Sequence, residues 1–158
     1  MVAEANAGQK GTIMQDANTG LVDGSTVMTL RGARAVQDLR PGDRIITRAG
    51  ALVLRDIDVR TEPQARLVRI SASALGNERP DEDIVVAADQ PILVRDWRAA
   101  ALAGTAAAMI PALRLADGEY IRAEARRDTR IFRLIFDQSA VIYAQGLEFG
   151  CEAVVVPA

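Results

Sequence analysis

Short runs of alternating apolar and polar residues, separated by turn signals, fill the chain from Ser25 onward. The runs are TVMTL, RAVQDL, RIIT and ALVLRDIDVR, divided by Arg31-Gly32, Arg40-Pro41-Gly42-Asp43 and Arg48-Ala49-Gly50. Such alternation is typical of β-strands with one buried face. Pro41 fixes φ for the second position of a tight turn, and Gly42 tolerates a positive φ at the third, so the chain should reverse here. This part of the sequence therefore predicts hairpins of short strands.

The second half of the chain continues the pattern with one interruption. Further strands are predicted in ARLVRISASAL, in DIVVAADQPILV with a break at Gln90-Pro91, at residues 109–115 and 120–121, and in IFRLIF and AVIYA, with turns at Asp117-Gly118 and near Asp137-Gln138-Ser139. Residues 96–108 instead predict a helix, because they are rich in strong helix formers and Asp96 can cap the first turn. Gly104 should weaken this helix in its middle, and Trp97 should anchor it to the sheet. Roughly ten strands with one or two short helices predict an all-β domain.

Length and composition fit one globular domain. With 158 residues, of which 49% are hydrophobic, the chain can bury a core without disulfides or a metal. We expect a flexible leader at residues 1–19, the β domain at residues 20–148 and a C-terminal tail at residues 149–158. No signal peptide is recognisable, and the longest mostly apolar stretch, residues 99–113, is too short to span a bilayer. We therefore expect a soluble protein that does not bind membranes, with its compartment, cytoplasmic or secreted, left open.

Composition excludes several kinds of chemistry. The chain has no histidine, which removes Ser/His, Cys/His and His-ligated metal sites together. Cys151 is the only cysteine, and its role stays open between a small packed residue and an exposed thiol. A net charge of −2 without a basic run predicts no nucleic-acid binding. The acidic run Asp81-Glu82-Asp83 predicts a solvated turn, and we expect no metal and no cofactor. A protein partner and the oligomeric state stay open.

Four segments, taken in order, resemble a known family. GSTVMTLRGARAVQDLRPGDRIITRAGAL is similar to the opening of Hint domains, the hedgehog/intein autoprocessing fold, and in particular of the bacterial hedgehog/intein-like branch. VVAADQPILV, MIPALRLADGEYI and IFRLIFDQSAVIYAQGLE resemble three further blocks of that family. The resemblance covers about residues 20 to 148. It implies a horseshoe-like all-β fold of short β-hairpins, in which pseudo-symmetric halves bring the start and end of the domain to one cleft.

The resemblance also implies a chemistry and the positions that would carry it. Family members begin with an N→S or N→O acyl shift, which needs a Cys, Ser or Thr nucleophile and an imidazole with a nearby hydroxyl to protonate the departing nitrogen. The family spacing places the nucleophile at Gly20, the hydroxyl at Ala87, the imidazole at Gln90 and a second histidine at Arg133. None of these four side chains can attack a carbonyl or transfer a proton near neutral pH. All four catalytic positions are therefore predicted to be vacant.

One interpretation is a catalytically inactive relict of an autoprocessing domain that acts as a binding or structural module. Asp89, Gln90 and Asp137 would then line the former cleft as hydrogen-bonding groups. The alternative for Gln90 is that it caps backbone groups of a strand, and for Asp137 that it organises the turn that follows Phe136. Complete splicing is not expected, because the chain ends Val156-Pro157-Ala158 without an asparagine.

Two other interpretations stay open. The first is an active autoprocessing domain that uses the hydroxyl of Thr19 or Ser25 for an N→O acyl shift, with Arg133 or Asp89 as the helping group. Thr19 lies one residue before Gly20, so a register shifted by one residue would place a hydroxyl at the bond to be cleaved; the alternative is a threonine in a turn. The second is an unrelated β-barrel that binds a small ligand or a protein.

Overall fold

The computed structural model describes residues 18–151 and 153. Most of the predicted leader, residues 1–17, and residues 152 and 154–158 of the predicted tail lie outside this part. The elements are β1 (Leu21–Val22), β2 (Thr26–Thr29), β3 (Gly32–Ala35), η1 (Val36–Asp38), β4 (Arg44–Thr47), β5 (Gly50–Val53), β6 (Asp56–Ile70), β7 (Ile84–Ala87), β8 (Pro91–Val94), α1 (Trp97–Ala103), β9 (Ala108–Pro111), η2 (Ala112–Leu115), β10 (Ile121–Ile135), β11 (Ala140–Ala144) and β12 (Leu147–Cys151). Strands dominate, so the predicted all-β class is confirmed.

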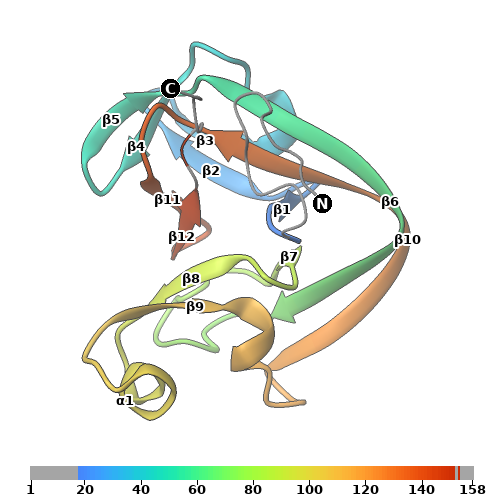
Figure 1. Cartoon of the computed structure of the whole chain (residues 1–158), viewed down its shortest axis with the longest axis vertical. Coiled ribbons are helices and arrows are strands. Elements are labelled where there is room, and N and C mark those ends of the chain that lie inside the picture. Colours follow the sequence, from blue (N-terminus) through green and yellow to red (C-terminus); the bar gives the residue numbers. More distant parts are fainter. Residues whose placement is uncertain (1–17, 152, 154–158) are drawn as a thin grey trace, which may run out of the picture.

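Two 15-residue strands, β6 and β10, form an antiparallel ribbon that connects the two halves of the molecule (Figure 1). Their pairing runs from Ile70 opposite Ile121 to Asp56 opposite Ile135. At the middle of the ribbon the regular pairing is interrupted between Pro63 and Asp128. Pro63 has no N–H to donate, and Asp128 has a positive φ of 50°. The prediction of separate short strands on either side of residues 122–130 is wrong, because pairing with β6 satisfies the backbone of this polar stretch.

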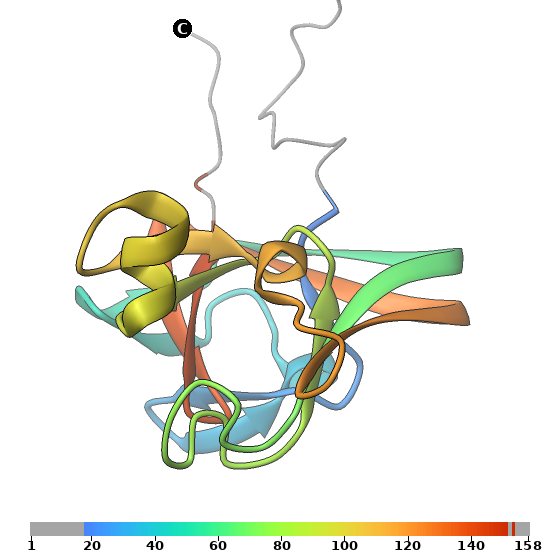
Figure 2. The same ribbon diagram turned by 90° about the horizontal axis from the view of Figure 1, so that it is seen from below.

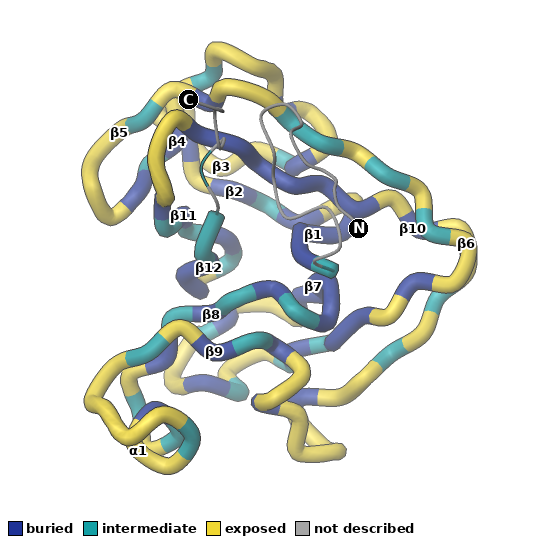
Figure 3. The backbone as a smooth tube through the Cα atoms, in the orientation of Figure 1, coloured by how far each residue is buried: buried dark blue, intermediate teal, exposed yellow. Residues whose placement is uncertain are grey.

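The strands, those of the ribbon included, form two sheets that share a hydrophobic core. One sheet has the order β3-β2-β4-β11-β12-β8-β9, with β5 beside β4, and in the other β1, β10, β6 and β7 close into a ring. The two-residue strand β1 closes the ring, because Leu21 lies opposite both Phe132 of β10 and Val86 of β7. Buried backbone runs through the middle of the molecule, whereas the bend of the ribbon and much of α1 are exposed (Figure 3). The start of the domain is thus held deep inside the fold.

Helix α1 is shorter than predicted and lies at the edge of the molecule opposite the bend of the ribbon (Figure 2). Asp96 caps it as predicted, with Oδ1 accepting the Arg98 N–H at 2.9 Å. Gly104 ends the helix in the left-handed conformation at a φ of 73°, instead of weakening its middle. The prediction for Trp97 is wrong: its side chain is 69% exposed, and Ala99 is the buried residue of the helix.

Several strand boundaries also differ from the prediction. RAVQDL contains the 3₁₀ helix η1, ALVLRDIDVR is divided between β5 and β6, and residues 71–83 form a loop after β6. The predicted reversal at residues 40–43 is confirmed, because the Asp43 N–H donates to the Arg40 carbonyl at 3.0 Å and Gly42 has a φ of 100°. None of the described helices is long and apolar enough to cross a membrane.

Candidate functional site

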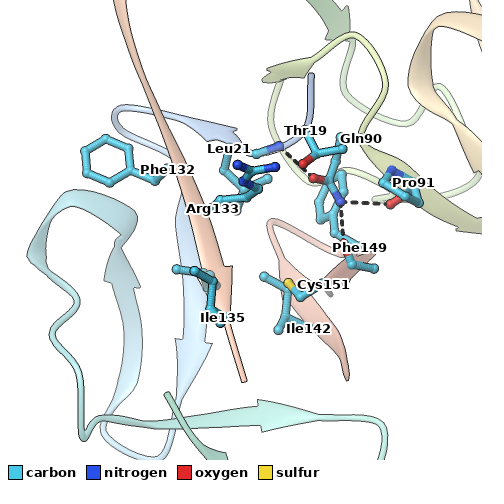
Figure 4. A pocket seen from close by; sticks show the side chains of 13 residues that line it. Thr19, Leu21, Gln90, Pro91, Phe132, Arg133, Ile135, Ile142, Phe149 and Cys151 are labelled. Atoms are coloured by element: carbon cyan, nitrogen blue, oxygen red, sulfur yellow. Dashed lines mark hydrogen bonds between the residues drawn. The ribbon is translucent and has the colours of Figure 1, made fainter. Parts of the chain in front are cut away.

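A small pocket lies where the start of β1, the β7–β8 connection, β10 and the end of β12 meet (Figure 4). Its lining includes the polar or reactive side chains of Thr19, Gln90, Arg133 and Cys151 together with Gly20, and most of the other lining residues are apolar. We call this the Gly20 pocket. Its cavity volume of about 20 Å³ is room for about one water molecule, so this pocket does not suit a separate substrate.

Gln90 fixes the peptide bond between Thr19 and Gly20. Its Oε1 accepts the Gly20 N–H at 2.8 Å, while its Nε2 donates to the carbonyls of Pro91 at 3.1 Å and Gly150 at 2.8 Å. The side chain is buried, and only one orientation of the amide matches an N–H on one side and two carbonyls on the other. Gln90 therefore joins the start of the domain to its last strand.

Gly20 fits this site because it has no side chain. Its φ is 129°, a conformation that residues with a Cβ rarely adopt. A Cβ at this position would lie 2.6 Å from the Ile131 Cγ2 atom and 2.8 Å from the Phe132 carbonyl oxygen. The Gly20 carbonyl accepts the N–H of Ala87 at 3.0 Å, so Gly20, Ala87 and Gln90, three of the four predicted catalytic positions, are in direct contact.

Arg60 of β6 holds the other side of the same peptide. Its Nη1 donates to the Thr19 carbonyl at 3.1 Å, and its Nη2 donates to Asn18 Oδ1 at 2.9 Å. The Asn18 carbonyl in turn accepts the N–H of Asp89 at 3.0 Å. Sequence reasoning missed Arg60, because its place depends on the register that sets it opposite Ile131 of β10.

Arg133 reaches the pocket from β10. It is 9% exposed, and its Nη2 donates to Asp58 Oδ2 on β6 at 3.0 Å. Asp58 lies directly opposite Arg133 in the ribbon, so the ion pair follows from the strand register. Apart from its acidic type, nothing in the sequence around Asp58 indicates that it pairs with Arg133.

The other predicted site residues lie outside the lining of the Gly20 pocket. The Ser25 hydroxyl is buried and donates to the Val22 carbonyl at 2.8 Å. The Asp137 side chain is 70% exposed and pairs with Arg55 at 3.3 Å, and Asp89 approaches the site through its backbone N–H. Cys151, whose role the sequence left open, is half-buried at the end of β12 and lines the pocket.

The most deeply buried carboxylate among the described residues belongs to a separate ion-pair network. Glu148 of β12 is 3% exposed and lies 2.8 Å from Arg48, 2.7 Å from Arg95 and 3.7 Å from Arg79. Burial raises the pKa of Glu148, but hydrogen bonds from Arg95 and Arg48 and their charges outweigh it, so the pKa lies below that of an ordinary glutamate. Among the described residues, no group of three or more Cys, Asp or Glu side chains is placed to hold a metal ion.

The part of the chain that forms the Gly20 pocket matches a known protein family. The family model described as Hint domain matches residues 19–155, which include the whole Gly20 pocket. The chain belongs to the Hint domain family. This confirms the resemblance stated from the sequence, and it sets aside the interpretation as an unrelated β-barrel. A search of curated protein sequences gave no match.

Solved structures of inteins and intein-like domains share the fold of this Hint domain. A bacterial intein-like domain from Clostridium thermocellum superposes with a TM-score of 0.60 at 13% identity, covering 87% of this chain and 99% of that one. For the MchDnaB-1 intein the TM-score is 0.53 at 14% identity, and the match covers 84% of this chain and 99% of the intein. For the gp41-1 intein the TM-score is 0.51 at 10% identity, and the match covers 82% of this chain and 97% of the intein. The Hint architecture thus persists at very low identity.

Proposed function

We propose that this Hint domain is catalytically silent and serves as a binding or structural module. The observation that carries the proposal is the conformation and the space at Gly20, which exclude a side chain at the position where the family resemblance predicts the nucleophile. An acyl shift at the Thr19–Gly20 bond needs an oxygen or sulfur nucleophile on the second residue of that bond, and glycine supplies neither.

The hydrogen bonding around the departing nitrogen also argues against cleavage. For the Thr19–Gly20 bond to break, the Gly20 nitrogen must gain a proton. Gln90 presents its carbonyl oxygen to this nitrogen at 2.8 Å, so it accepts a hydrogen bond from the Gly20 N–H and has no proton to give to the nitrogen. With this partner the bond is held in its ordinary amide form.

A part of the former site retains a polarising group. The guanidinium of Arg60 donates to the Thr19 carbonyl oxygen, the atom that would become negatively charged during attack. Such a donor stabilises an oxyanion only when a nucleophile forms one. In the proposed silent domain, Arg60 and Gln90 act together as a clamp that fixes the start of β1.

The rival function is autoprocessing by a hydroxyl. Thr19 is the stronger candidate, because it is buried in the pocket next to the Asn18 carbonyl, which accepts a hydrogen bond from Asp89. The Ser25 hydroxyl is directed to the Val22 carbonyl and lies outside the pocket lining.

The test uses the full chain and a fusion with a folded reporter placed before residue 1. Both are incubated near neutral pH, with and without dithiothreitol or hydroxylamine, and followed by intact mass. The expected result is an unchanged mass in every condition. Cleavage at Asn18–Thr19 or Thr19–Gly20 would overturn the proposal; loss of that cleavage in Thr19→Ala, but not in the matched Ser25→Ala, would establish Thr19 as the nucleophile.

A further inference from the structure

The arginines of the described part of the chain differ in whether they pair with a carboxylate. Many form an ion pair with a carboxylate, as Arg48, Arg69 and Arg130 do. Arg31, Arg34, Arg40 and Arg44 are exposed, and within the described part of the chain their guanidinium groups take part in no ion pair and no hydrogen bond. Because they lie within fourteen positions of one another, their charges are concentrated on one part of the surface.

These four arginines surround one hollow. Its volume is about 370 Å³, and it is lined by Thr29, Leu30, Arg31, Arg34, Asp38, Arg40, Gly42, Asp43 and Arg44. We call it the arginine hollow. A volume of this order is typical of small-molecule sites, which range over about 300–1,000 Å³. The arginine hollow is therefore far larger than the Gly20 pocket.

The backbone around the hollow is fixed. The β2–β3 hairpin carries Arg31 and Arg34, and the Leu30 N–H donates to the Arg44 carbonyl at 3.0 Å, which ties the hairpin to the start of β4. In the turn before β4, the Asp43 carboxylate accepts the Arg40 N–H at 2.9 Å. The arginines thus project from rigid elements, although their guanidinium groups have no partner in the described chain.

The charge balance favours an anion. The lining has four arginines against Asp38 and Asp43, an excess of two positive charges in a chain whose net charge is −2. The Asp43 carboxylate is already engaged by its turn, so it competes poorly for the guanidinium groups. Guanidinium groups bind phosphate oxygens through paired, charge-assisted hydrogen bonds. A concave site also fits a compact ligand better than a flat surface.

We propose that the arginine hollow binds a compact, multiply charged phosphate anion, such as a diphosphate group. This site is separate from the Gly20 pocket, and the proposal holds whether or not that pocket is catalytically silent. Arg34 and Arg44 supply the main contacts, because each projects from a strand, and Asp38 opposes binding by its charge.

The test is isothermal titration calorimetry of the full chain with sodium pyrophosphate at low ionic strength. Arg34→Gln and Arg44→Gln should each weaken binding about tenfold, the loss expected for a charge-assisted hydrogen bond. Arg122→Gln is the matched control, because Arg122 is exposed on β10, away from the hollow. Asp38→Asn should tighten binding several-fold, which a partly unfolded variant would not do.

Other outcomes separate the proposal from its rivals. An absence of pyrophosphate binding in the native chain overturns it, as does an equal loss of affinity in Arg122→Gln, which would indicate only general charge attraction. A sedimentation assay with vesicles containing phosphatidylglycerol forms a second arm. Vesicle binding that needs Arg34 and Arg44, without pyrophosphate binding, would assign the hollow to a lipid surface and overturn the compact ligand.

Discussion

Replacing Gly20 with alanine tests the central feature of the Gly20 pocket. The added methyl group has two separate costs. The backbone of the new alanine must hold a φ of 129°, and for a residue with a Cβ this strain costs about 1–3 kcal/mol. Its Cβ must also fit within 2.6 Å of Ile131 Cγ2 and 2.8 Å of the Phe132 carbonyl oxygen. Overpacking of this kind costs about 1–3 kcal/mol, and the carbonyl cannot retreat without disturbing the β1–β10 pairing.

The two costs together predict that Gly20→Ala lowers the free energy of unfolding by about 4 kcal/mol, or the melting temperature by about 8–16 °C. Gly24→Ala is the matched control, because Gly24 has a φ of 95° with no heavy atom within 4 Å of an added Cβ, so it carries only the backbone cost. Urea unfolding followed by circular dichroism measures both variants. If Gly20→Ala were no more destabilising than Gly24→Ala, the close contact would carry no energy and the steric argument for a vacant nucleophile position would fail.

Two further predictions concern residues outside the pocket. Glu148→Gln should lower the free energy of unfolding by about 2–4 kcal/mol at neutral pH, since breaking a buried ion pair costs about 3–5 kcal/mol and the arginines here keep part of their hydration. The folded state holds the pKa of Glu148 below its unfolded value of about 4.3, so its stabilisation is fully present above that value and is lost as the pH falls through the folded pKa. Urea unfolding at a series of acid pH values should show that the free energies of unfolding of Glu148→Gln and the native chain approach each other as the pH falls. The surface control Asp137→Asn should lower the free energy of unfolding by less than about 1 kcal/mol at every pH. Trp97→Ala should lower stability by no more than about 1 kcal/mol, because the residue is 69% exposed and its ring contacts the Arg98 guanidinium in an exposed cation–π pair; a loss of several kcal/mol would contradict this.

Local signals in the sequence were sufficient for the short strands and the turns. The Pro41-Gly42 turn and the strand β4 depend on residues next to one another, and both were predicted. Trp97 shows the limit of this reasoning, because an apolar side chain near a helix start does not tell which way it faces. Gly104 did carry a usable signal, since glycine commonly ends helices, but it was interpreted as a weak point within one.

Contacts between distant segments could not be predicted in the same way. Only the family resemblance identified four candidate positions, namely Gly20, Ala87, Gln90 and Arg133. The structure places these residues in or beside one pocket. Arg60 belongs to the same site, but its place is set by the β6–β10 register, which no local pattern encodes. Residues 122–130 look like a polar loop for the same reason: only their pairing with β6 makes them a strand.

The pairing of β1 with β10 sets an order of events during synthesis. Leu21 can pair with Val86 of β7 earlier, but the pairing of Leu21 and Val22 with β10 needs Phe132 and Ile131, and Gln90 donates to the Gly150 carbonyl near the end of β12. The ribosome synthesises the N-terminal segment first, but more than a hundred further residues must be synthesised before β1 can pair with β10. Non-local β pairing of this kind folds slowly, over milliseconds to seconds. In a nascent chain, the surroundings of the Thr19–Gly20 peptide are therefore complete only when translation of the domain is almost finished.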